Sequence, residues 1–225
     1  MIQTIVLSMV INYSPKKINF ILIDFKGGLL ANRLRDLPHV KKVITSLDEK
    51  IETEFEYLRD ELIRREKILS EYGENNIIGF NKKYPGERIP SLMIIIDEFA
   101  EMKARFPEYM KDIMSIARIG RTLEVHLLLS TQKPLGVVDD QIYANSRYKF
   151  CLRVNDKFES QEILNIPDAS KIQYPGRGFL KQLSYEDKFD RKYACWTYNY
   201  KGWRKYKRSN HRTARRKLKD SQYWI

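Results

Sequence analysis

An unbroken apolar run, Leu92–Ile96, followed at once by Asp97 and Glu98, constrains the fold of this chain most. A run of this length is typical of a strand buried on both faces, as in a parallel sheet. Similar short apolar runs, separated by helical patterns, predict further strands at Ile18–Ile23, His39–Ile44, Val125–Ser130 and Tyr148–Val154. This alternation predicts an α/β domain with a largely parallel sheet.

Helices are predicted where apolar residues recur every three to four positions. These segments are Met1–Asn12, a long charged helix from Ser46 to about Ser70, Pro107–Ala117 and Phe158–Leu164. Gly27 and Gly28 mark a tight turn after the first strand. The stretch Tyr72–Pro90 is predicted to be a loop, because Gly, Asn and Pro occur throughout it.

The net charge of +12 is distributed very unevenly along the chain. Residues 188–225 contain 13 Lys or Arg and two acids, whereas residues 1–187 contain 28 and 27. The body of the chain is therefore nearly neutral. The global charge does not by itself indicate that this body binds nucleic acid.

The two cysteines and three histidines lack the spacing of a metal site. Cys151 lies in an apolar run and is predicted to be a buried thiol. The apolar N-terminus has no basic region and no small-residue cleavage site, so it does not fit a signal peptide. No apolar run approaches the ~20 residues that a membrane helix needs.

The acids after the apolar strand form the most informative motif. Parallel sheets place ligands at the carboxyl ends of their strands, so Asp97 and Glu98 are expected at such an edge. The first acid can hold Mg²⁺, and the second can orient and deprotonate a water that attacks a γ-phosphate. This is the Walker B pattern, although a buried strand ending in a solvated acidic turn has the same appearance.

Two other strand ends are expected beside this motif. Thr131 and Gln132 follow the next strand, and an amide there can sense a γ-phosphate or position the water. A simple turn is the alternative. The segment Asp24–Gly28 ends an earlier strand at the same edge. It lies either near the nucleotide or in an ordinary strand-to-loop turn.

From Met1 to about Leu180 the chain resembles the FtsK/SpoIIIE family of motor ATPases. Six blocks occur in the order found in that family: Ile23–Gly28, Leu37–Val40, Glu61–Arg65, Ile95–Glu101, Ile116–Arg121 and Val125–Pro134. Three further blocks resemble the membrane-bound ATPase of type VII secretion more than the chromosome translocases: Gly136–Ile142, Asn145-Ser146 and Pro175–Gly178.

The resemblance implies a RecA-like P-loop NTPase fold that uses ATP and Mg²⁺. It implies Asp97 as the magnesium-side acid, Glu98 as catalytic base and Gln132 as sensor, with Thr131 beside the nucleotide. It also implies a ring or stack in which an arginine reaches a neighbour's nucleotide. The candidates for such trans contacts are Arg118, Arg121 and Arg153, each of which is alternatively a surface arginine. The secretion branch carries its arginine on the long helix, where this chain has Thr53.

The phosphate-binding motif GxxxxGK[ST] does not occur in these 225 residues. Gly27-Gly28 cannot replace it, because no lysine and hydroxyl follow. In the family the loop immediately precedes a helix like Met1–Asn12. We therefore expect a reading frame that extends upstream, so that residues 1–183 are an N-terminally truncated ATPase domain. We expect no ATP turnover, and no micromolar MgATP binding, by these residues alone.

Residues 184–225 depart from the family pattern and become basic and aromatic. One interpretation is an out-of-register segment, as a frameshift produces. The other is a genuine basic tail, disordered until bound, whose interleaved Tyr, Trp, Lys and Arg suit nucleic acid.

Three functions fit the sequence. The resemblance favours part of a motor ATPase that drives protein export in a type VII-like system, with secreted proteins as substrates. It implies copies of itself or neighbouring ATPase domains as partners, and the cytoplasmic side of the membrane as location. The alternatives are a DNA translocase domain of the same family and an inactive, ATPase-like docking module.

Overall fold

The computed structural model describes residues 1–45 and 51–182, and the backbone of 193–197. The chain divides after Arg147 into two compact units, residues 2–147 and the residues that follow. Each unit has its own sheet and its own core, and each is described separately. The described helices are α1 (Ile2–Asn12), α2 (Leu29–Leu34), α3 (Ile51–Tyr72), α4 (Ile77–Lys83), α5 (Phe99–Arg105), α6 (Met110–Leu123), α7 (Asp140–Asn145) and α8 (Lys157–Leu164).

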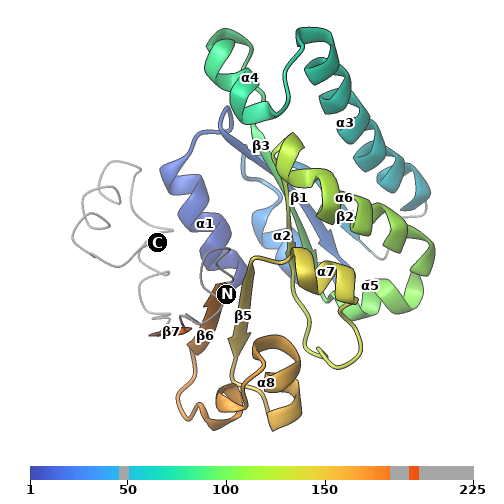
Figure 1. Cartoon of the computed structure of the whole chain (residues 1–225). Helices are drawn as coiled ribbons and strands as arrows, with labels where there is room; N and C mark the ends of the chain where they lie inside the picture. Colours follow the sequence, from blue (N-terminus) through green and yellow to red (C-terminus); the bar gives the residue numbers. More distant parts are fainter. Residues whose placement is uncertain (46–50, 183–192, 198–225) are drawn as a thin grey trace. The chain divides into compact units, whose positions relative to one another are not determined.

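A four-stranded parallel sheet with the order β2-β1-β3-β4 forms the centre of the first unit (Figure 1). Its strands are β1 (Ile18–Asp24), β2 (Val40–Thr45), β3 (Ser91–Asp97) and β4 (Val125–Leu129). Asp24 pairs with Asp97, and Ile96 pairs with Leu129. The strands are thus in register at their carboxyl ends, which meet at one edge. The predicted α/β class with a largely parallel sheet is confirmed for this unit.

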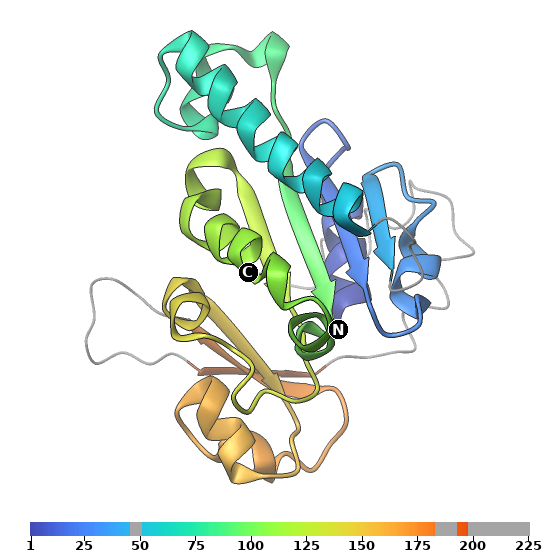
Figure 2. The same ribbon diagram turned by 90° about the vertical axis from the view of Figure 1, so that its right-hand side faces the viewer.

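Alternate side chains of the central strands enter two different cores. Ile21 and Ile23 of β1 belong to the larger core with residues of α3, α4 and α6, whereas Phe20 and Leu22 pack with residues of α1 and α2. In Figure 2, α3 and α6 lie in front of the strands and α1 lies behind them. Burial on both faces explains why these strands are apolar at nearly every position.

A buried arginine ties three segments of the first unit together. Arg65 on α3 is 1% exposed. It donates to Glu61 at 2.7 Å, to the Leu123 carbonyl at 2.8 Å and to the Pro90 carbonyl at 2.8 Å. The long helix is therefore fastened to the end of α6 and to the segment before β3. Arg64, its neighbour, also contacts Glu61 but is exposed.

Gly120 allows a close approach between helix and sheet. A Cβ added there would lie 2.3 Å from the Val125 carbonyl oxygen, so α6 can only pass the start of β4 without a side chain at this position.

The second unit has an antiparallel sheet of β5 (Tyr148–Leu152), β6 (Arg177–Gln182) and β7 (Tyr193–Thr197). Its core contains Cys151, and burial raises the pKa of this thiol to about 11, as expected for an inert core cysteine. Lys149 and Lys181 lie opposite each other on β5 and β6 and are both buried.

Several predicted elements need correction. The stretch Tyr72–Pro90 is not only loop: α4 lies within it, because Asn76 caps the helix by accepting from Gly79 N–H and because Ile77 and Phe80 are buried. The short helices α2, α5 and α7 were not predicted. The start of the long helix at Ser46 lies outside the described residues. The strand at Tyr148 pairs in the antiparallel sheet rather than the parallel one.

Within residues 184–225 the structure describes only β7, so the interpretations of the basic tail remain predictions. None of the helices in the described part of the chain is long and apolar enough to cross a membrane.

Candidate functional site

Four polar side chains from two neighbouring strands gather at the carboxyl edge of the parallel sheet. Asp97 ends β3, and Ser130 follows β4 directly. The Ser130 hydroxyl donates to Asp97 Oδ1 at 2.8 Å. The Thr131 hydroxyl donates to Glu98 Oε1 at 2.8 Å. Each acid of the predicted Walker B pair is therefore held by a hydroxyl of the adjacent strand end.

Glu98 has a backbone conformation that is uncommon for a residue with a side chain. Its φ and ψ are 59° and 65°, in the left-handed region, and it is 9% exposed. Such a conformation costs roughly 1–2 kcal/mol for an L-residue. The turn is held by the Phe99 N–H, which donates to the Ser130 carbonyl at 2.7 Å. Residues in strained conformations cluster at functional sites, which fits a catalytic role for Glu98.

The Glu98 carboxylate has two further donors. The backbone N–H of Gln132 donates to Oε1 at 3.1 Å. The Lys26 ammonium, from the segment after β1, lies 3.4 Å from Oε2. Contacts from both neighbouring strands thus converge on this one side chain.

Asp24 has a structural role in this edge. It is 1% exposed and accepts from the backbone N–H groups of Lys26, Leu30 and Ala31 at 3.0, 2.9 and 3.2 Å. The two later groups belong to the first turn of α2, so Asp24 caps that helix. This supports the ordinary-turn alternative for Asp24 and leaves Lys26 as the residue of its segment that contacts Glu98.

The donor set at this edge fits a hard cation. Carboxylate and hydroxyl oxygens of Asp97, Glu98 and Ser130 are the ligand types that Mg²⁺ takes. Among the described residues no group of three His, Cys, Asp or Glu side chains forms a dedicated metal cage. A Mg²⁺ site here would thus rely on Asp97 together with ligands from a nucleotide and water, as is usual for this ion.

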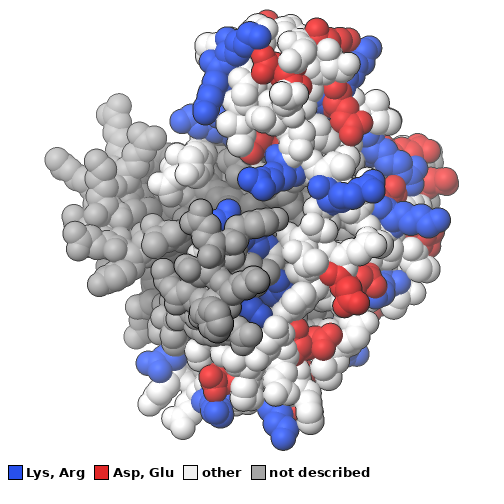
Figure 3. Space-filling model, viewed as in Figure 1, with Lys and Arg blue, Asp and Glu red and all other residues white. Residues whose placement is uncertain are grey.

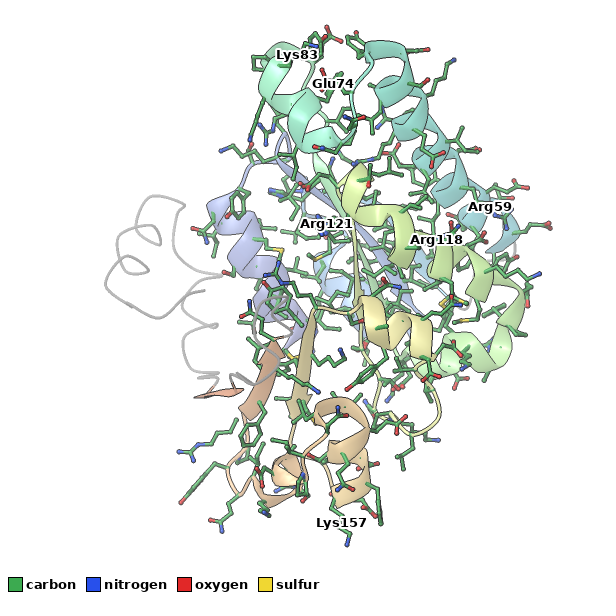
Figure 4. The ribbon with its side chains drawn as sticks, viewed as in Figure 1. Arg59, Glu74, Lys83, Arg118, Arg121 and Lys157 are labelled. Carbon is green, nitrogen blue, oxygen red and sulfur yellow. The ribbon has the colours of Figure 1, made fainter. Side chains whose placement is uncertain are left out.

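The remaining predicted residues lie in different places. The Gln132 side chain is exposed, and it is the backbone of this residue that contacts Glu98. Arg118 and Arg121 project from α6 (Figure 4), are exposed, and have no ion pair with another described residue. Arg153 is exposed after β5 in the second unit, and Thr53 is exposed on α3.

The sequence analysis placed the segments of Lys26 and Ser130 at this edge, but it named neither residue as part of the site. Ser130 had a signal, because it is the first polar residue after the strand that neighbours β3. Lys26 had none of its own, because its contact with Glu98 spans 72 positions of sequence.

The chain is similar in sequence to known proteins over most of its length. The family model for FtsK/SpoIIIE matches residues 1–135. The type VII secretion system protein EssC of Staphylococcus aureus is 42% identical over 209 residues, which cover 89% of this chain and 14% of EssC. The ESX secretion system protein YukB of Bacillus subtilis is 38% identical over 87% of the chain. The chain spans about one seventh of the length of these curated relatives.

Solved structures show the same architecture. The cytoplasmic domain of the Thermomonospora curvata type VII secretion ATPase EccC matches with a TM-score of 0.76 and 29% identity, over 87% of this chain and 23% of that one. The pCW3 conjugation coupling protein TcpA, solved with ATPγS, matches with a TM-score of 0.70 and 26% identity, over 86% and 55%. The parallel sheet and its helices are therefore those of ATPase domains.

Proposed function

Because the chain belongs to the FtsK/SpoIIIE family, we propose that it supplies the magnesium-side and water-activating half of an ATP-hydrolysing motor domain. It is homologous to the ATPase domains of EssC and EccC, and the predicted membership of this family is confirmed. The single observation that carries the proposal is the in-register end of β3 and β4, where hydroxyls hold Asp97 and Glu98 in place.

Each residue at this edge has a separate role in the proposed reaction. Asp97 would hold Mg²⁺, directly or through water, with the Ser130 hydroxyl fixing its orientation. Glu98 would accept a proton from the attacking water, and Thr131 and the Gln132 backbone keep its carboxylate in one place. Bound Mg²⁺ supplies positive charge that offsets the charge developing on the phosphates. The exposed Gln132 side chain is available to sense the γ-phosphate.

We propose protein export of the type VII kind as the process that this domain drives, because EssC and YukB are named for such systems. The partners would be copies of this domain or neighbouring ATPase domains. Arg118, Arg121 and Arg153 are the candidates for contacts with a neighbour's nucleotide, since none has a described ion-pair partner. The site of action would be the cytoplasmic side of the membrane, because the matching part of EccC is named as its cytoplasmic domain.

DNA translocation is the alternative function, because TcpA is a conjugation coupling protein with the same fold. Figure 3 shows acidic residues among the basic ones over α3 and α4 on the face in view. Nearly equal numbers of acids and bases in residues 1–187 agree with this. The export proposal is therefore preferred. Failure of DNA to stimulate ATP hydrolysis would support this preference.

The proposal is tested in an extended chain, in which a strand and a GxxxxGK[ST] loop are joined before Met1. Glu98→Gln should lower turnover by about 100-fold or more while MgATP binding is retained, because only the proton acceptor is lost. Glu101→Gln is the matched control, since Glu101 lies one turn away on α5 and should leave turnover unchanged. Unchanged turnover in Glu98→Gln would show that Glu98 is not the base.

A further inference from the structure

The two oxygens of the Glu98 carboxylate are held with different firmness. Oε1 accepts from the Thr131 hydroxyl at 2.8 Å and from the Gln132 N–H at 3.1 Å, both at the end of β4. Among the described residues, Oε2 has a single donor, the Lys26 ammonium, at the longer distance of 3.4 Å. Two donors fill the acceptor sites of Oε1, so Oε2 is the oxygen that can take a proton from water.

The side chain of Lys26 can move away from Glu98 at little cost. Its side chain is 49% exposed, whereas that of Glu98 is 11% exposed. A partly exposed ion pair stabilises little and is easily broken. The Lys26 backbone is anchored to Asp24 at 3.0 Å, and Gly27 and Gly28 that follow have φ of 85° and 71°. The ammonium can therefore change partner while the backbone that carries it stays in place.

We propose that Lys26 is a positioning residue that exchanges Glu98 for a phosphate oxygen when MgATP binds. While the ammonium contacts Glu98, it restrains Oε2 and occupies an acceptor position that a proton from water would need. A triphosphate has several negative charges and competes for a flexible lysine, a common phosphate binder. When the Lys26 ammonium leaves Glu98, Oε2 is free to accept the proton. This inference rests on the proposed function.

The nucleotide-free half of the exchange is tested in the 225-residue chain by urea unfolding. The single variants Lys26→Met and Glu98→Gln and their combination form a double-mutant cycle. We expect a coupling of about two- to fivefold in the unfolding equilibrium constant, the range for a partly exposed pair. Lys133→Met is the matched control, because that lysine follows the same β4 end and its ammonium has no described partner. Additive effects for Lys26 and Glu98 would overturn the restraint.

The nucleotide-bound half is tested by the affinity of the extended chain for MgATPγS and MgADP. Glu98→Gln should tighten MgATPγS binding by about two- to fivefold, the same factor as the coupling in the unliganded chain, because the neutral amide no longer competes with the phosphates for the ammonium. In a Lys26→Met background the same change should have no effect. Lys26→Met alone should weaken MgATPγS binding about tenfold, and Lys26→Arg should restore most of it.

Each result has one meaning. Simple loss of repulsion between Glu98 and the phosphates would tighten binding equally in both Lys26 backgrounds, which would overturn the exchange and leave the proposed function standing. Unchanged MgATPγS affinity in Lys26→Met would do the same. An extended wild-type chain that binds neither nucleotide would overturn the exchange and the proposed function together.

Discussion

Replacing Arg65 by methionine should destabilise the first unit far more than replacing its neighbour Arg64. Both arginines contact the same carboxylate, Glu61, at 2.7 Å. They differ in burial, because the side chain of Arg65 is 2% exposed and that of Arg64 is 50% exposed. The comparison therefore isolates burial and the carbonyl contacts, with the ion-pair partner held constant.

The expected magnitude follows from what each change leaves behind. Removing one member of a buried ion pair typically costs about 3–5 kcal/mol. Arg65→Met also leaves the carbonyls of Leu123 and Pro90 without this donor, about 1–3 kcal/mol each if no water replaces it. These contributions overlap, and methionine keeps the aliphatic packing, so we expect about 3–5 kcal/mol in total. Arg64→Met should cost about 0–1 kcal/mol.

The assay is urea unfolding followed by far-ultraviolet circular dichroism, with both variants and the wild type at about pH 7. A difference of under about 1 kcal/mol between the variants would refute the reasoning, because burial would then contribute nothing beyond the shared ion pair. Equal slopes with urea concentration would show that the comparison is between similar unfolded states.

The contacts of Glu61 with Arg64 and Arg65 also make the stability of the fold depend on pH. Burial raises the pKa of Glu61, but hydrogen bonds from Arg64 and Arg65 outweigh burial and lower it below its ordinary value of 4.5. A lowered carboxyl pKa stabilises the fold above the unfolded pKa, and this stabilisation is lost as the pH falls through the folded value. In Arg65→Met, the free energy of unfolding should therefore fall less steeply as the pH drops below about 4.5.

Two further predictions concern packing and alkaline pH. Gly120→Ala should cost about 1–3 kcal/mol of stability, because its Cβ would meet the Val125 carbonyl. Gly86→Ala is the control and should change stability by less than about 1 kcal/mol, because a Cβ there meets nothing within 4 Å. Equal effects of the two changes in urea unfolding would contradict this prediction. Burial and the nearby Lys181 lower the pKa of Lys149 to about 8. The second unit should therefore gain stability as the pH rises from about 8 to about 10.5, and Lys149→Met should abolish this gain in unfolding curves across that range.

The parts of the fold that could be predicted from sequence are those with a local signal. The apolar run of β3 predicted a strand that the structure has at Ser91–Asp97. The helix predicted at Pro107–Ala117 is of the right type, but α6 begins at Met110 and continues to Leu123. The helix α4 was missed, because its Gly and Asn residues were interpreted as breakers. Asn76 is instead the cap, and the packing of Ile77 and Phe80 overrides weak propensity.

In the site, too, features with a signal in adjacent residues were predictable, and features that depend on distant residues were not. Asp97 and Glu98 were predictable, because a strand end and two acids are adjacent in sequence. The left-handed backbone of Glu98 was not, because it depends on the Phe99 N–H meeting the carbonyl of Ser130, on another strand. Contacts that hold a site are often non-local, and a pattern within one segment does not contain them.

The order of the strands has a consequence for how the chain acquires its site during synthesis. The contacts that hold the two acids join segments 33 and 72 residues apart. Parallel pairing over such distances is slow, because a long loop must close before any contact forms. On the ribosome, Asp97 and Glu98 emerge well before Ser130 and Thr131, so both acids lack their hydroxyl partners until β4 is made. The site is thus completed by the last strand of its sheet to leave the ribosome.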